Sequence, residues 1–195
     1  MARQRTTTPR KPDDARAHRS VEALRTAFLS LIETRPFESV TIRDITAAAG
    51  VSYPTFFRRF AGKDELLADI ATAEVRHLLA LGAGAMGTPG ASSPQAMCDH
   101  VAAHRRLWCT LLTGGAASAM REEFMAIVRD MAASRPRINP WIPVDLAVPF
   151  VAAGLFEILS WWMRQPADYP VANVVTLIDA LVVDVTARPR PITLA

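Results

Sequence analysis

The sequence is poor in cysteine, with only Cys98 and Cys109 among its 195 residues. Two cysteines are too few to staple a small secreted fold, so a disulfide scaffold is excluded. Both lie in one apolar stretch, which predicts buried, reduced thiols in a cytosolic protein.

Long hydrophobic runs are also scarce. No apolar run approaches the ~20 residues that a bilayer-spanning helix needs, so no membrane segment is expected. Residues Met1 to Arg19 are charged and hold no hydrophobic stretch of the secretory kind. These two absences predict a soluble cytoplasmic protein without a membrane partner.

Features of common enzymes are missing as well. No stretch alternates like a strand, and no nucleotide-binding glycine loop or internal repeat is present. Glu122 and Glu123 are adjacent on a predicted helix and point apart, and no nucleophile–base grouping can be assembled. No catalytic residue, cofactor or metal is therefore predicted. A small α-helical enzyme or ligand-binding protein with an incidentally basic N-terminus remains the alternative.

Positive charge is concentrated at one end of the chain. Residues 1–63 hold 12 Lys and Arg against 6 Asp and Glu, whereas residues 64–195 hold 10 against 13. This asymmetry predicts a head that binds a polyanion, joined to a different kind of body. It disfavours an architectural nucleoid protein, whose basic residues would be spread over the chain. Flexible basic tails are common, however, and six of the 12 cations lie at or before Arg19.

Every strong periodicity in the sequence is helical. Apolar spacing, caps and breakers predict helices over Asp14–Thr34, Thr41–Ala49, Tyr53–Arg59, Lys63–Ala80, Gln95–Leu112, Ala117–Ser134, Val144–Arg164 and Val171–Thr186. Loops are expected over Gly82–Pro94 and Arg135–Pro143.

The predicted fold is all-α, with about nine helices in two domains. A disordered basic arm (1–13) precedes a three-helix N-terminal domain (14–81). A C-terminal helical domain (95–187) and a short tail (188–195) follow.

The segment Thr41–Phe60, TIRDITAAAGVSYPTFFRRF, carries the functional prediction. Two short helices meet at a glycine turn, and alanines allow their close crossing, so the second helix protrudes and fits a DNA major groove. That helix offers hydroxyls, an aromatic side chain and two cations to DNA. An ordinary helical hairpin with solvated arginines is the alternative, and the charge asymmetry favours DNA.

Residues Val40–Leu67 resemble the DNA-binding domain of TetR-family regulators. The resemblance lies in T-I-R-D-I at 41–45, A-A-A-G-V-S at 47–52, T-F-F at 55–57 and F-x-G-K-D-E-L-L at 60–67. With the preceding amphipathic helix it covers about residues 14–80. In the body, A-A-G-L-F-E-I-L-S-W-W at 152–162 is similar to a dimer-interface helix of some members.

The resemblance implies roles for individual residues in DNA binding. Thr41 and Arg43 match positions that touch the phosphate backbone, and Lys63 matches a lysine that grips a phosphate at a helix N-terminus. Ser52, Tyr53 and Thr55 match the leading end of the recognition helix. The candidate DNA-binding residues are Thr41, Arg43, Ser52, Tyr53, Thr55, Phe57, Arg58, Arg59 and Lys63.

Three positions in this segment depart from the usual family pattern. Phe57 stands where a tyrosine is usual and lacks its phosphate-directed hydroxyl. Arg59 replaces a frequent histidine, and Pro54 a frequent glycine. Upstream, the arm cations Arg3, Arg5, Arg10 and Lys11 either reach an adjacent groove or supply only non-specific attraction.

The resemblance further implies a repressor that binds a palindromic operator as a homodimer and is released by a small effector. On this reading residues 14–81 are the helix-turn-helix DNA-binding domain and residues 95–187 the effector-binding and dimerisation domain. The two C-terminal helices are apolar around their circumference, which indicates a four-helix dimer interface, the body's own core, or both. The candidate interface residues are Leu155, Leu159, Trp162, Val174, Ile178 and Leu181.

The effector is expected to be neutral or hydrophobic, because few charged groups fall within the apolar helices of the body. Its candidate lining residues are Trp108, Leu111, Phe124, Met125, Val128, Met131, Trp141 and Phe150, a set that also fits an ordinary core. His100 and His104 have the i, i+4 spacing of metal ligands, but a polar helix face explains them better.

Overall fold

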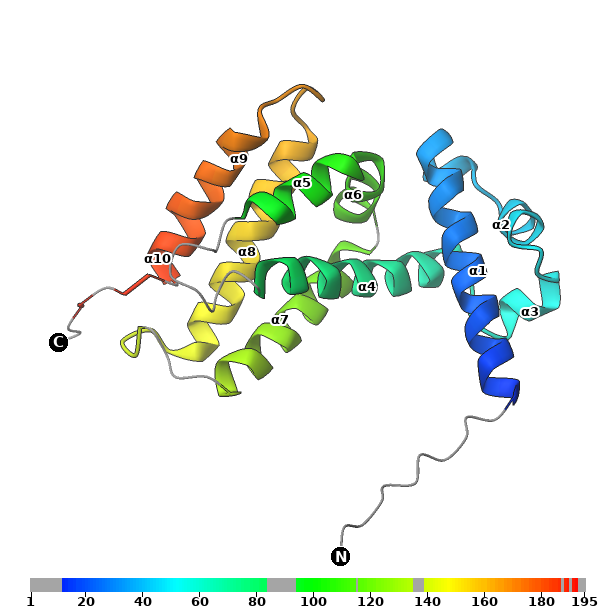
Figure 1. The fold of residues 1–195 in the computed structure, drawn as a ribbon, viewed down its shortest axis with the longest axis horizontal. Coiled ribbons are helices and arrows are strands. Elements are labelled where there is room, and N and C mark those ends of the chain that lie inside the picture. The colour runs from blue at the N-terminus through cyan, green and yellow to red at the C-terminus, as the bar shows by residue number, and fades with distance from the viewer. Residues whose placement is uncertain are drawn as a thin grey trace, which may run out of the picture. The chain divides into compact units, whose positions relative to one another are not determined.

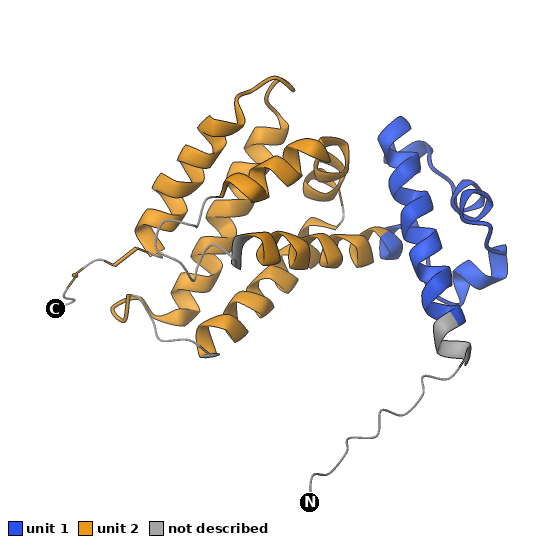
Figure 2. Ribbon diagram, in the orientation of Figure 1, with its two compact units in different colours: residues 1–66 blue, residues 67–195 orange. Residues whose placement is uncertain are grey.

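The computed structural model describes residues 12–83, 94–114, 116–134, 139–186, 188–189 and 191–192. Within these ranges the chain is helical with connecting turns, as the all-α prediction requires. It divides into two compact units, residues 1–66 and 67–195 (Figures 1 and 2). Most of the predicted arm and most of the predicted 82–94 loop lie outside the described residues.

Unit 1 contains four helical segments and the beginning of a fifth. They are α1 (Pro12–Thr34), the 3₁₀ turn η1 (Phe37–Ser39), α2 (Ile42–Ala49), α3 (Tyr53–Phe57) and the first turn of α4 (Lys63–Ala83). Helix α1 ends before Pro36, because a residue that precedes proline avoids the α conformation. The core of the unit is apolar and fully buried, with Leu24, Phe28, Ile45, Phe56 and Leu66 each 0 % exposed.

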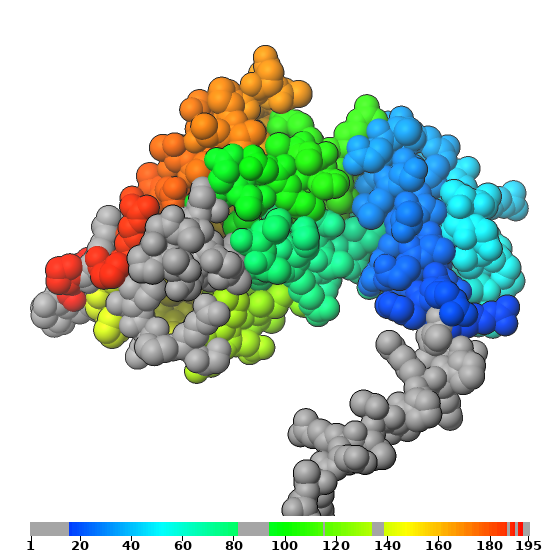
Figure 3. All heavy atoms as spheres, viewed as in Figure 1, coloured from blue at the N-terminus to red at the C-terminus, as the bar shows by residue number. Residues whose placement is uncertain are grey.

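Unit 2 holds the rest of α4 and the C-terminal helices. These are α5 (Gln95–Ala103), α6 (Arg105–Thr113), α7 (Ala117–Ser134), α8 (Val144–Met163), α9 (Val171–Ile178), the π-helical turn η2 (Asp179–Val183) and α10 (Asp184–Thr186). Helix α8 packs against α6, α7 and α9, and α9 lies beside α5 (Figure 3). Its central position explains why the sequence of α8 is so apolar.

Three sequence predictions differ from these boundaries. The predicted helix 95–112 is two helices, broken at His104, whose φ of −116° and ψ of 35° are not helical. The predicted recognition helix reaches only Phe57, and Arg58 and Arg59 form a turn. Helix α4 runs to Ala83, three residues beyond the predicted end at Ala80.

Helix α8 also contradicts the expectation that no apolar run approaches membrane-spanning length. It has 20 residues with a mean hydropathy of 1.6, which by length and composition alone is enough to cross a bilayer. The core helix of a folded domain passes the same test, and α8 buries Leu155, Phe156 and Trp162 among its neighbours.

A set of hydrogen bonds and one close packing contact hold α8 in unit 2. The guanidinium of Arg105 donates hydrogen bonds to the carbonyl oxygens of Trp162 (3.0 Å) and Gln165 (2.6 Å), which places a cation at the negative end of the helix dipole. At Gly154 a Cβ atom would lie 3.1 Å from Cγ2 of Val182, so α8 and η2 approach each other closely there.

Candidate nucleic-acid interface

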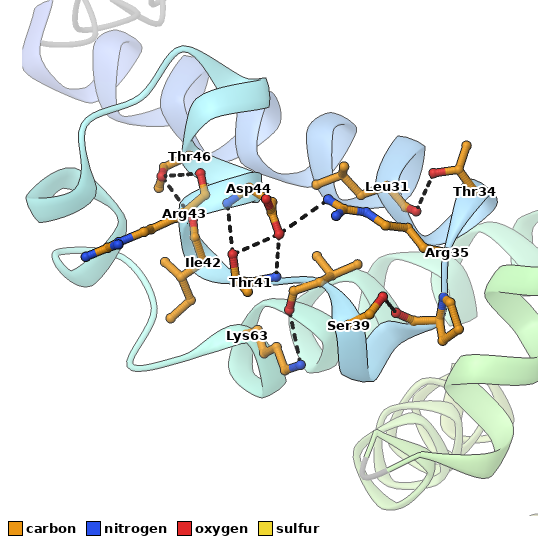
Figure 4. A network of polar contacts seen from close by, with 12 residues as sticks. Leu31, Thr34, Arg35, Ser39, Thr41, Ile42, Arg43, Asp44, Thr46 and Lys63 are labelled. Atoms are coloured by element: carbon orange, nitrogen blue, oxygen red, sulfur yellow. Dashed lines mark hydrogen bonds and ion pairs between the residues drawn. The ribbon is translucent and has the colours of Figure 1, made fainter.

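Helix α2 begins with a complete capping box. The backbone N–H of Asp44 donates to Oγ1 of Thr41 (3.2 Å), and the backbone N–H of Thr41 donates to Oδ2 of Asp44 (2.9 Å) (Figure 4). The Thr41 hydroxyl also donates to Oδ2 of Asp44, and Arg35 lies 3.3 Å from the same oxygen. The backbone hydrogen bond from Thr41 is the largest of several effects that lower the pKa of Asp44.

This network constrains how the start of α2 meets DNA. The Thr41 hydroxyl already donates to one oxygen and accepts from one nitrogen, and the Asp44 carboxylate occupies the positive end of the helix dipole. Arg43 is exposed and extends away from the network (Figure 4). Of the two predicted contacts on α2, Arg43 is therefore the group that is free to meet a phosphate.

The turn between α2 and α3 depends on Gly50. Its φ of 62° and ψ of 29° are left-handed, and within the described ranges it is the one residue with a positive φ. The amide of Val51 returns to the carbonyl of Thr46 (3.0 Å), which closes the helix end. Three residues, 50–52, thus connect the end of α2 to the start of α3 at Tyr53.

Side-chain hydrogen bonds run along the exposed surface of α3. Arg58 Nη2 donates to Oγ1 of Thr55 (2.7 Å), which lies 2.8 Å from Oγ of Ser52. Either hydroxyl can donate in the Ser52–Thr55 contact, because the Thr55 oxygen can accept from both Arg58 and Ser52. When Thr55 donates to Ser52, the Ser52 proton is left for an outside acceptor such as a phosphate oxygen.

Two aromatic side chains on α3 are exposed and two near its end are buried. Tyr53 is 47 % exposed and Phe57 46 %, and their ring centroids lie 5.1 Å apart. Phe56 is 0 % exposed and Phe60 6 %, and their rings are 5.8 Å apart. The buried pair therefore anchors the recognition segment in unit 1, while the other pair faces outward.

Lys63 is engaged within the protein. Its Nζ donates to the carbonyl oxygens of Phe37 (3.0 Å), Glu38 (3.2 Å) and Val40 (3.2 Å). It also lies 4.3 Å from the centroid of the Phe37 ring. An ammonium group has three protons, and here each has an acceptor. Lys63 thus clamps the 37–40 segment in this structure, and its phosphate contact stays a prediction.

The candidate DNA-binding residues all lie in unit 1, on α2, α3, the turn that follows α3 and the start of α4. Exposed members are Thr41, Arg43, Ser52, Tyr53, Phe57, Arg58 and Arg59, whereas Thr55 and Lys63 are half-buried. Sequence reasoning missed the contribution of Arg35 and the pairing of Tyr53 with Phe57. The i, i+4 spacing of the two aromatics was the available signal.

The candidate effector-binding residues lie in unit 2 but in different environments. Trp108, Leu111 and Phe124 are core residues, Met125, Val128, Met131 and Trp141 are half-buried, and Phe150 is exposed. Phe150, 49 % exposed, therefore does not line a buried pocket. The indole N–H groups of Trp108 and Trp162 are buried without a hydrogen-bond partner among the described residues.

Most of the candidate interface residues are buried within the chain itself. Leu155, Leu159, Trp162, Val174 and Ile178 are at most 5 % exposed, so their side chains offer little surface to a second copy. Leu181 is 56 % exposed. Other apolar side chains of α8 face outward instead, namely Leu146 (59 %) and Phe150 (49 %).

The histidine pair is part of a small polar cluster on unit 2. Nε2 of His100 lies 2.8 Å from Oε2 of Glu74, and the His100 ring centroid lies 4.6 Å from that of His77 and 4.5 Å from that of His104. Among the described residues no group of three or more His, Cys, Asp or Glu side chains is arranged to hold a metal ion.

The geometry of unit 1 defines a helix-turn-helix DNA-binding protein. Residues 24–70 match the family model described as bacterial regulatory proteins, tetR family. This segment is accordingly a DNA-binding domain of the tetR family of bacterial transcriptional regulators, and regulators of that family are not enzymes. A search of the curated proteins found no match.

Solved structures share the overall fold at low sequence identity. A TetR transcriptional regulator from Streptococcus agalactiae 2603V superposes with a TM-score of 0.54 at 20 % identity, covering 87 % of this chain and 97 % of that one. The fatty acid degradation regulator FadR from Bacillus halodurans gives 0.58 at 14 %, covering 90 % and 97 %. FadR from Thermus thermophilus, solved with lauroyl-CoA, gives 0.51 at 19 %, covering 90 % and 100 %.

Proposed function

We propose that this protein is a repressor of the bacterial cytoplasm that binds a palindromic operator as a homodimer and releases it on binding a small apolar effector. The observation that carries the proposal is the exposed surface of the recognition segment. Ser52, Tyr53, Phe57, Arg58 and Arg59 are exposed there, on a helix anchored by buried aromatics. A helix presented in this way fits the major groove, and its flanking cations suit phosphates.

The proposed homodimer is supported by the short stretch of DNA that one recognition helix can contact. A single helix contacts only a few base pairs, so specific sites are normally read by two helices about one DNA turn apart. Unit 2 offers exposed apolar side chains on α8, Leu146 and Phe150, and Leu181 on η2, which contacts α8. Two copies that bury these side chains would form the four-helix interface expected of the C-terminal helices.

An effector site in unit 2 is supported by unsatisfied polar groups within an apolar core. Trp108 and Trp162 are buried, and their indole N–H groups, which only donate, have no acceptor among the described residues. A buried donor without a partner costs about 1–3 kcal/mol. A ligand with an apolar body and one carbonyl or carboxylate acceptor would satisfy such a donor. In the lauroyl-CoA bound by the Thermus thermophilus structure, the acyl part alone has this character, an apolar chain that ends in one thioester carbonyl.

Footprinting on the DNA that flanks the gene tests the proposal. The expected result is a protected palindrome whose affinity falls steeply with salt, because each phosphate contact releases a counterion. Arg43→Gln and Arg59→Gln should each lower the slope of log K against log salt by about one. If neither substitution changes the slope, these arginines do not contact DNA phosphates. Uniform, sequence-independent binding would refute the specific repressor.

A further inference from the structure

The exposed aromatic pair on α3, Tyr53 and Phe57, is unusual for this protein. These two are the only large hydrophobic side chains exposed in unit 1 among the described residues. Of the eight phenylalanines in the sequence, only Phe57 and Phe150 are exposed where the structure describes them. Phe150 lies on α8, far along the chain, in the surface proposed for the dimer. The exposure of Phe57 therefore needs an explanation of its own.

The Phe57 ring is held in place rather than free on the surface. It packs edge-on against Tyr53, with centroids 5.1 Å apart and planes at 63°, and against the buried Phe56, at 5.4 Å and 74°. Edge-to-face packing of this kind orients aromatic rings and limits the entropy lost on binding. Phe57 thus presents a rigid apolar surface.

The surroundings of the pair restrict what this surface can meet. Arg58 and Arg59 follow it directly and are exposed, so the partner is expected to be anionic. Phe57 has no polar atom and cannot contact a phosphate by a hydrogen bond. In the major groove the base edges of adenine, guanine and cytosine display donors and acceptors, and thymine alone adds an apolar group, its C5 methyl.

We infer that Tyr53 and Phe57 together recognise a thymine C5 methyl group in each operator half-site. This inference rests on the proposed operator binding and names the base contact made there. Tyr53 and Phe57 lie on one face of α3, four residues apart, and their packed rings form one continuous apolar surface on which a methyl group can rest. Arg58 is drawn back along the helix by its bond to Thr55, which leaves the aromatic surface uncovered by that side chain.

The test removes the methyl group without touching the protein. The full-length protein selects a duplex from random-sequence DNA, and each thymine of that duplex is then replaced by deoxyuridine. We expect one symmetry-related pair of positions to be sensitive, with a loss of about fourfold per methyl and roughly 15-fold for both half-sites. Fluorescence anisotropy at fixed salt measures the affinities. If no single replacement lowers the affinity, the inference is overturned, while selection of a palindrome would still support the repressor.

A double-mutant cycle links the methyl to the pair. In Phe57→Ala the sensitive position should lose most of its response to deoxyuridine, whereas Phe57→Tyr, which keeps the ring, should retain it. The matched control Arg59→Gln should weaken binding to thymine and deoxyuridine duplexes equally. Thermal unfolding of each variant confirms that it folds. If folded Phe57→Ala keeps the full response to deoxyuridine, the inference is overturned. It is also overturned if Phe57→Ala binds the thymine duplex as tightly as the original protein, a result that would assign the aromatic pair to a protein-binding surface. Failure to select any sequence would overturn both proposals.

Discussion

Nζ of Lys63 lies 3.0 Å from the carbonyl oxygen of Phe37, across 26 positions of sequence, and 4.3 Å from the centroid of its ring. The same nitrogen also binds the carbonyl oxygens of Glu38 and Val40. A lysine at the start of a helix faces the positive end of the helix dipole, which is unfavourable. The three carbonyl groups offset that cost and join the 37–40 segment to the beginning of α4.

Replacement of Lys63 should therefore act mainly by lowering the stability of the folded protein, rather than by removing a charge that contacts DNA. We expect Lys63→Met, which keeps a long apolar chain, to lower the stability of the protein by about 1–3 kcal/mol, because hydrogen bonds to a charged group are lost. Thermal unfolding measures this change. Lys63→Arg is the matched variant, and its planar guanidinium should restore only part of the stability because it cannot reproduce a compact three-proton donor.

The salt dependence of DNA binding then separates a clamp from a phosphate contact. If Lys63 acts through the 37–40 segment, Lys63→Met should weaken binding while the salt slope stays within about half a unit of the original. A slope lower by about one would instead show that the ammonium group meets a phosphate in the complex.

The capping box of α2 should make stability depend on pH in the acid range. The hydrogen bonds from Thr41 lower the pKa of Asp44 from its ordinary value near 3.8. A folded-state pKa below the unfolded value means that the contribution is fully present above the unfolded value and is lost as pH falls through the folded one. Unfolding midpoints of the original protein and Asp44→Asn should hence differ at pH 6 and converge as the pH falls below 3.8 and through the lowered pKa of Asp44. A difference that stays constant with pH would contradict this account, and Thr41→Ser, which keeps the box, serves as the control.

The exposed apolar side chains of α8 should determine the oligomeric state. Phe150→Glu is expected to raise the dimer dissociation constant roughly 100-fold or more, because a two-fold interface buries each side chain twice. Sedimentation velocity measures the mass. Ile192→Glu, at another exposed apolar residue (42 %), should leave the dimer intact. Unchanged dimerisation in both Leu146→Glu and Phe150→Glu would place the interface elsewhere.

The two cysteines should differ in reactivity. Burial raises the pKa of the Cys98 thiol to about 12, and the nearby Asp99 carboxylate adds to the effect. Burial also raises the pKa of Cys109, which Arg105 partly opposes. Because the thiolate is the nucleophile, Cys98 should react very slowly with a thiol-specific reagent at pH 8, and Cys109 faster. In Cys109→Ser only the slow reaction of Cys98 should remain, and in the unfolded protein Cys98 should no longer react slowly. A fast reaction at Cys98 would show that this part of unit 2 opens readily.

Helix positions were largely predictable, because local signals determine them. The apolar stripe of α1, the cap at Thr41 and the break at Gly50 are all properties of neighbouring residues. The break at His104 was not predictable in this way. Val101 and Trp108 are both buried and lie seven residues apart, a spacing that a single continuous helix would also show. No glycine or proline marks the interruption.

The environment of individual site residues was less predictable, since it depends on segments far apart in sequence. The three acceptors of Lys63 lie 23 to 26 positions away, and nothing near Lys63 reveals them. The same limitation affected the interface residues. Apolar composition indicates that Leu155 and Trp162 are buried, but it does not distinguish burial within one chain from burial between two.

Gly50 has a consequence for how this protein tolerates mutation. A Cβ atom added there would meet nothing within 4 Å, so the restriction comes from its backbone angles alone. Asparagine and aspartate visit the left-handed region at modest cost, whereas β-branched residues do so rarely. At Gly154 the restriction is spatial, because an added Cβ atom would lie 3.1 Å from Cγ2 of Val182. In a library of variants selected for repression, asparagine should therefore be accepted at Gly50 and valine rejected. At Gly154, acceptance should depend only on the size of the new side chain.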